Sequence, residues 1–273
     1  NANQHGLNVL SCIGTNKPNQ YVGTAPEASF WLLGSEDSRS EFPIEEDYWA
    51  AAIEYADSVG VDVVNTSLGY SKFDEPAKSY THQDLNGRTA LISIVANKAV
   101  DKGIFVVGSA GNSGDSEWSK ITVPGDAINM LTVGAIKSDS TMAKFSSRGM
   151  TADLRVKPDV VTLGVNASVV NDKGLVRSSN GTSFSSPIMC GMVACLWQAL
   201  PALTNKELLN IIRETASKHE KFDEKYGFGI PDMKKAWDEG KILVARKETK
   251  AANEKKAATN NIVPKKTRTK KAN

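Results

Sequence analysis

The feature that most constrains this chain of 273 residues is a serine placed between a glycine and a long apolar run. Residues 180–187 read NGTSFSSP, and the apolar run 188–200 follows at once. This pattern predicts that Ser183 lies at the start of a helix, where unpaired backbone N–H groups and the helix dipole favour negative charge. We interpret Pro187 as a residue of the first helical turn, which has no N–H partner to lose. An ordinary N-capping serine is the alternative for such a motif taken alone.

Other short motifs come before Ser183 in a definite order. They are His5-Gly6, Ser67-Leu68-Gly69 at the end of one apolar strand, Ala110-Gly111-Asn112 at the end of another, and FSSRG at 145–149. A serine hydroxyl needs an adjacent base to become a nucleophile, and histidine commonly serves as that base. His82 falls in a polar stretch and His219 beyond a helix end, so we interpret both as surface residues. Taken alone, His5 near a terminus would also be a surface residue, so its assignment as the base depends on Gly6 and on the motifs downstream.

With these motifs in this order, the chain resembles the subtilisin-like serine proteases, the subtilases, from His5 to about Trp237. The serine motif G-T-S-x-[S/A]-x-P is matched at every fixed position. The histidine motif departs from the family, which usually has HGTHVAG where residues 5–11 read HGLNVLS. The bulkier Leu7 and Leu10 predict different packing beside the histidine. The resemblance implies a serine endopeptidase with a three-layer α/β fold, in which helices cover both faces of a mostly parallel sheet.

The resemblance also implies roles for individual residues. Ser183 would attack the scissile carbonyl and His5 would take its proton. The side chain of Asn112 and the backbone N–H of Ser183 would form the oxyanion hole; for Asn112 alone, a turn asparagine is the alternative. One wall of the first specificity pocket would comprise Ser67, Leu68 and Gly69, and the other Ser109, Ala110 and Gly111. A protein or peptide substrate would add as a strand along these walls, so we expect broad specificity and an apolar pocket.

One element of the family pattern is absent. Subtilases carry a catalytic aspartate on a strand before the histidine, and no aspartate precedes His5. We expect this chain to be part of a longer protease, with the first, Asp-bearing strand missing. The rival interpretation is a non-catalytic binding module, or an inactive fragment, that keeps the protease fold.

Two other enzyme classes do not fit the sequence. The α/β-hydrolases need a G-x-S-x-G pentapeptide, which is absent. Gly108, Gly111 and Gly114 follow a strand but lack the G-x-G-x-x-G spacing of dinucleotide-binding folds.

Charge divides the chain into two parts. Residues 244–273 hold ten Lys or Arg and two Glu, which leaves 23 basic and 29 acidic residues in 1–243. We expect 1–243 to be one catalytic domain with a single sizeable core, and 244–273 to be a basic, disordered tail or linker. An arm that binds nucleic acid or an anionic surface is the alternative for this tail. The tail contains no aromatic residue to stack on bases, so nucleic acid is not an expected partner.

Expectations about cofactors and location follow mainly from the resemblance. No organic cofactor and no metal-binding side chain is assigned, although carbonyl groups of residues 14–23 offer ligands for a structural calcium ion. The resemblance implies an inhibitory propeptide and a secreted or periplasmic location, and no signal peptide is visible. The longest apolar run, 188–200, is shorter than the roughly 18 residues that cross a membrane.

Alternating apolar runs and amphipathic stretches predict a parallel sheet covered on both faces. The expected strands are 30–33, 61–67, 104–107, 130–136 and 159–162. The expected helices are 47–59, 87–102, 188–200 and one that follows the capping box at 204–207. We expect Cys12, Cys190 and Cys195 to be buried free thiols.

Overall fold

Four parallel strands form the central sheet of this computed structural model, which describes residues 2–260. In spatial order they are β3 (Val63–Thr66), β4 (Phe105–Ser109), β5 (Leu131–Ile136) and β8 (Val160–Leu163). The register places Val64 opposite Val106, Val107 opposite Leu131 and Val133 opposite Val160. Parallel neighbours need long crossover connections. The connection from β3 to β4 contains the helix Leu91–Lys102, whereas the described residues 110–130 and 137–159, which connect β4 to β5 and β5 to β8, contain no helix.

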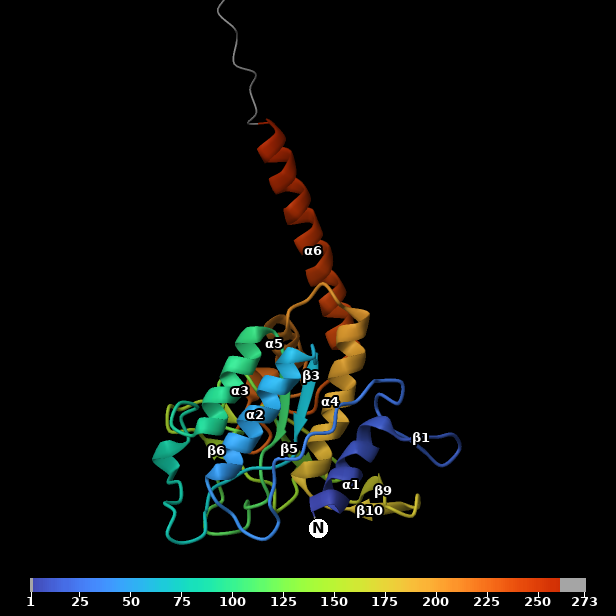
Figure 1. Cartoon of the computed structure of the whole chain (residues 1–273). Coiled ribbons are helices and arrows are strands. Elements are labelled where there is room, and N and C mark those ends of the chain that lie inside the picture. Colours follow the sequence, from blue (N-terminus) through green and yellow to red (C-terminus); the bar gives the residue numbers. More distant parts are fainter. Residues whose placement is uncertain (1, 261–273) are drawn as a thin grey trace, which may run out of the picture.

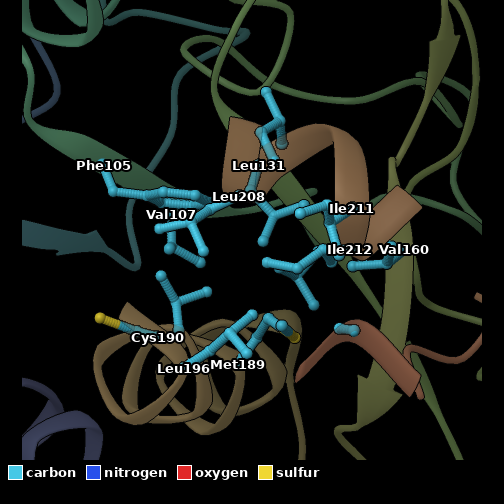
Figure 2. Close-up of a cluster of buried hydrophobic side chains, with 14 of the residues drawn as sticks. Phe105, Val107, Leu131, Val160, Met189, Cys190, Leu196, Leu208, Ile211 and Ile212 are labelled. Carbon is cyan, nitrogen blue, oxygen red and sulfur yellow. The ribbon is translucent and has the colours of Figure 1, made fainter. Parts of the chain in front are cut away.

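Helices cover both faces of this sheet (Figure 1). On one side lie α2 (Ile44–Ser58) and α3 (Leu91–Lys102), and on the other α4 (Thr182–Ala199) and α5 (Asn205–Glu214). Successive residues of a strand point to opposite faces, so Val106 joins the core under α3 while Val107 joins the core under α4. Figure 2 shows the second core, where side chains of α4 and α5 meet those of the strands. The predicted three-layer α/β fold is confirmed.

Several smaller elements complete the described chain. They are α1 (Ala2–Gly14), β1 (Asn16–Lys17), β2 (Tyr21–Val22), β6 (Gly149–Met150), β7 (Val156–Lys157), β9 (Ala167–Val170), β10 (Val176–Ser179), the 3-10 helices His82–Asp84 and His219–Lys221, and α6 (Met233–Asn260). The strands β9 and β10 form an antiparallel hairpin. The helix α1 packs between this hairpin and the start of α4, through a buried cluster that contains Cys12, Val169 and Phe184. This packing brings α1 to the serine motif.

The capping box predicted at 204–207 is present. The Thr204 hydroxyl accepts the Glu207 N–H at 3.3 Å, and the Glu207 carboxylate accepts the Thr204 N–H at 2.7 Å. The helix α5 therefore begins at Asn205, directly after its cap.

The strand expected at 30–33 is not formed. This segment is coil, and Trp31 and Leu32 are 59% and 70% exposed. The ring of Trp31 instead lies edge-on against Tyr55 of α2, with centroids 5.5 Å apart. A strand needs a hydrogen-bonding neighbour, and among residues 2–260 β3 is paired on one side only. The apolar run 30–33 has no strand partner among residues 2–260.

The described part of the expected tail is helical. Residues 244–260 continue α6, which projects from the body (Figure 1). Leu243 and Val244 pack against the core, and the Lys247 ammonium donates to the Ala202 carbonyl at 2.9 Å. Lysine-rich composition predicts disorder, but Ala, Glu and Lys are also strong helix formers. Residues 261–273 lie outside the described residues, and the division at residue 243 stays a prediction.

The cysteines differ from the expectation in one respect. Cys12 and Cys190 are buried, whereas Cys195 is exposed on α4. Burial raises the pKa of both the Cys12 and the Cys190 thiol to about 12. All three are free thiols.

A buried charge network fixes the start of β8. The Asp159 carboxylate accepts the Lys157 ammonium at 2.7 Å, the Arg213 Nε–H at 3.0 Å and the Thr132 N–H at 2.7 Å. Lys157 and Asp159 are almost completely buried. Burial alone would raise the pKa of Asp159, but Arg213 and Lys157 outweigh it and lower that pKa.

We predict that Asp159→Ala lowers the free energy of unfolding by about 3–5 kcal/mol, because it leaves two cations without their buried counter-ion. Asp101→Ala is the matched control: it breaks an exposed ion pair with Lys206 and should cost less than about 1 kcal/mol. Urea denaturation followed by circular dichroism measures both values. Equal losses in the two variants would contradict a stabilising role for the buried network.

Candidate active site

Ser183 lies in the first turn of α4, as predicted. Gly181 is the N-cap residue with φ 150° and ψ 152°, a conformation that favours glycine, and its N–H bonds the Gly164 carbonyl at 2.9 Å. Ser183 is the second helical residue, so its own N–H has no partner within the helix. Ser183 as a whole is 9% exposed, and its hydroxyl donates to the Ser67 carbonyl at 3.4 Å.

Pro187 lies deeper in the helix than the first turn, which corrects that interpretation. It is the sixth residue of α4, so its missing N–H leaves the carbonyl of Ser183 without its usual helical donor. The Ser67 hydroxyl donates to this carbonyl at 2.9 Å. Ser67 in turn accepts the Asn65 amide at 3.0 Å, and the Ser186 hydroxyl donates to Asn65 at 2.7 Å. Pro187 therefore leaves the Ser183 carbonyl free to accept a hydrogen bond from Ser67, which directly follows β3.

Asn112 follows β4 and is held by the residue before Ser183. Its Oδ1 accepts the Thr182 N–H at 2.9 Å and the Thr182 hydroxyl at 3.0 Å. The Thr182 hydroxyl also accepts the Gly111 N–H at 3.2 Å. Only an oxygen can accept the Thr182 N–H, so the carboxamide orientation is determined. The Asn112 Nδ2 group donates no hydrogen bond among the described residues. It lies near Gly181, since a methyl group placed on that glycine would be 3.7 Å from Nδ2.

His5 reaches the same place from α1. It lines a cavity of about 420 Å³ together with Ser183 and Asn112. The other lining residues are Gln4, Asn8, Ser179, Asn180 and Phe184. The structure thus brings together the three side chains predicted to carry the chemistry, from three elements far apart in the sequence.

The histidine and the serine are not hydrogen-bonded to each other in the described chain. The His5 ring lies tilted against Phe184, with centroids 6.1 Å apart. Desolvation by its neighbours lowers the pKa of His5 below 6.5, which favours the neutral imidazole that can accept a proton. No carboxylate is among the residues that line the cavity.

None of the six residues predicted to form the pocket walls is among those that line this cavity, and their role as walls stays a prediction. Ser67 contacts Ser183 directly, whereas Leu68 and Gly69 continue beyond β3 and Ser109, Ala110 and Gly111 lie where β4 ends. Sequence reasoning missed the cavity-lining residues Gln4 and Asn8. Helical spacing could have indicated them, because Gln4 and Asn8 are four residues apart on the helix that carries His5. The Gln4 amide donates to Asn8 at 3.2 Å.

Neither metal sites nor membrane spans are found within residues 2–260. No group of three or more His, Cys, Asp or Glu side chains is placed to hold a metal ion there. Residues 14–23, whose carbonyls were considered for calcium, contain the β1–β2 hairpin. No helix in the same range has the length and apolar character needed to cross a bilayer.

Comparison with known proteins gives consistent matches. Residues 1–229 match the model of the Peptidase_S8 family, described as the subtilase family. Subtilisin Savinase of Lederbergia lenta is 31% identical over 219 residues, which cover 79% of this chain and 71% of that protein. Subtilisin E of Bacillus subtilis (strain 168) is 31% identical over 215 residues, 78% of this chain and 50% of that protein. The chain spans about half the length of this relative and of M-protease from Shouchella clausii (strain KSM-K16).

Solved structures show the same fold at lower sequence identity. The self-cleaved protease domain of PatA superposes with a TM-score of 0.69 at 20% identity, covering 87% of this chain and 83% of that domain. The prenylagaramide maturation protease PagA gives a TM-score of 0.64 at 18% identity, with 87% and 82% covered. These structures support the architecture of the chain.

We predict that the pKa of the His5 ring, the midpoint of its titration, lies below its usual 6.5, because its neighbours, Phe184 among them, partly desolvate this exposed residue and so disfavour the charged form. Phe184→Ala should raise the midpoint toward 6.5. Phe222→Ala removes a phenyl ring that packs against Phe228 instead and should leave the midpoint unchanged. Histidine ring signals in NMR spectra recorded across pH give these values. A wild-type midpoint at or above 6.5 would contradict the desolvated environment.

Proposed function

The chain belongs to the subtilase family, and from this premise we propose that it is a serine endopeptidase that hydrolyses peptide bonds of proteins. The observation that carries the proposal is the arrangement at the start of α4. There the oriented Asn112 carboxamide and the unpaired Ser183 N–H supply two donors, and His5 lines the same cavity. Such a set of groups serves acyl transfer.

In the proposed reaction, the Ser183 oxygen attacks the carbonyl carbon of the scissile bond and its proton passes to His5. The negative charge on the former carbonyl oxygen is stabilised by Asn112 Nδ2 and the Ser183 N–H. His5 then gives the proton to the leaving amine, and water hydrolyses the resulting ester by the same steps. The Ser183 hydroxyl must first exchange its contact with the Ser67 carbonyl for one with His5. Such contacts are often loose before substrate binds.

The substrate would lie along the segments that follow β3 and β4. Ser67, Leu68 and Gly69 offer backbone groups to an extended peptide, and Ser109, Ala110 and Gly111 face them as the second wall. Strand addition of this kind relies on main-chain hydrogen bonds. We extend the proposal to a secreted or periplasmic protein controlled by an inhibitory propeptide. No organic cofactor is required, and carbonyl groups of residues 14–23 are the ligands proposed for a structural calcium ion.

A second candidate function is a non-catalytic binding module with the protease fold. Two observations within the described residues favour it. The cavity has no carboxylate to orient His5, and His5 and Ser183 make no hydrogen bond. Loss of the triad aspartate costs about 3 × 10⁴ in kcat in a subtilisin, so low activity of this chain is compatible with either candidate. A direct probe of the nucleophile separates them.

We predict that a fluorophosphonate probe labels the full chain covalently at Ser183, because the activated hydroxyl attacks phosphorus and the oxyanion hole holds the phosphoryl oxygen. Ser183→Ala should abolish labelling, whereas Ser186→Ala should retain a labelled nucleophile. Mass spectrometry of the digested protein locates the adduct. A chain that circular dichroism shows to be folded, yet remains unlabelled, would favour the binding module.

We predict that Asn112→Asp slows labelling by about 10²–10³, the loss known for an oxyanion-hole asparagine in a subtilisin. The new carboxylate can still accept the Thr182 N–H but cannot donate to the oxyanion. Asn180→Asp is the matched control, because it adds the same charge to the same cavity and keeps an acceptor for the Asn166 N–H. Equal slowing in the two variants would assign the effect to charge and reject the role of Asn112 as a donor.

A further inference from the structure

A third segment closes the gap between the two proposed pocket walls. Residues 121–123 run across the ends of both walls and bond to each. The Thr122 N–H donates to the Ala110 carbonyl at 3.1 Å, while Tyr70 and Val123 exchange backbone hydrogen bonds of 2.9 and 3.0 Å. The segment therefore forms a floor attached to one wall through Ala110 and to the end of the other through Tyr70, the residue that follows Gly69.

The side chain of Thr122 occupies the space above this floor. A methyl group placed on Gly69, in one wall, would lie 2.4 Å from Thr122 Oγ1. A methyl group placed on Gly111, in the opposite wall, would lie 2.9 Å from the same oxygen and 3.1 Å from Thr122 Cγ2. One threonine thus touches both walls, at the two positions where each wall has no side chain of its own.

The surroundings keep this threonine in place. Thr122 is 7% exposed, and Ala110 and Ser147 beside it are completely buried. The Ser147 hydroxyl accepts the Ser113 N–H at 3.0 Å, and its own N–H donates to the Gly111 carbonyl at 2.9 Å. A β-branched side chain also has few rotamers to choose from. The gap cannot widen without breaking these contacts.

We propose that Thr122 restricts the residue on the acyl side of the scissile bond to a small side chain, namely that of Gly, Ala or Ser. This inference rests on the proposed function, since it takes the segments after β3 and β4 as the walls that receive that side chain. A residue inserted between the walls can use only the room that Thr122 leaves. A large apolar residue such as Phe would overlap it. The inference replaces the expected broad, apolar pocket with a narrow one.

The test measures binding, so that it does not depend on catalysis. Two fluorescein-labelled tetrapeptides that differ only in a C-terminal Ala or Phe are titrated against the Ser183→Ala variant of the 273-residue chain, and fluorescence anisotropy gives the dissociation constants. We expect the Ala peptide to bind at least about tenfold more tightly, as for a pocket that excludes extra methylene groups. Adding Thr122→Gly should abolish or reverse this preference, and Thr122→Ala should reduce it.

A matched variant separates volume from hydrogen bonding. Thr122→Val keeps the size and branching of the side chain and removes only the hydroxyl, so it should retain the preference for Ala. Thermal denaturation confirms that each variant is folded. If the Thr122→Gly variant does not fold, the comparison of Thr122→Ala with Thr122→Val tests the proposal instead. Loss of the preference in Thr122→Val would reject a steric role.

The remaining outcomes distinguish this inference from the proposed function. Equal binding of the two peptides, or no binding of either, overturns the inference. If fluorophosphonate labelling of the wild-type chain succeeds in that case, the protease proposal stands without it. Selective binding of the Ala peptide without any labelling supports the narrow pocket and counts against catalysis.

Discussion

The contact between Asn112 and Thr182 is the constraint on which the site depends. It joins the end of β4 to the first turn of α4 through two hydrogen bonds to one oxygen, and Thr182 passes the connection on to Gly111. The same contact fixes the orientation of the Asn112 carboxamide, because its oxygen must face Thr182, the residue before Ser183. Because both elements also bury side chains in the shared core, the geometry of the site is inherited from the packing of the sheet.

The sequence allowed the layered fold and the central residues of the site to be predicted, because the signals involved are local. Apolar runs gave four of the five expected strands, and the capping box at Thr204 located the start of α5. Ser183 and Asn112 stand in short motifs whose glycines permit unusual backbone angles, as at Gly181 and Gly111. The role of His5 was harder to predict, because a single histidine does not indicate catalysis until the serine and asparagine motifs are recognised.

What the sequence could not supply depends on partners distant along the chain. An apolar run such as 30–33 forms a strand only beside another strand. No strand lies beside this run among the described residues, and its side chains are exposed. The role of Pro187 depends on a hydroxyl 120 positions earlier, that of Ser67. The narrow pocket that we propose depends on Thr122, which belongs to no motif and acts only through the floor segment 121–123. Each of these is a property of packing.

The unequal burial of the cysteines gives this chain an internal reporter of its folded state. Cys195 is accessible at the surface of α4, whereas Cys12 lies between α1 and the β9–β10 hairpin and Cys190 lies in the main core. A reagent that needs the thiolate meets one available sulfur in the folded chain and three in the unfolded chain. The number of thiols alkylated per chain therefore measures the fraction of molecules that are unfolded. Partial opening around α1 alone would add a single equivalent.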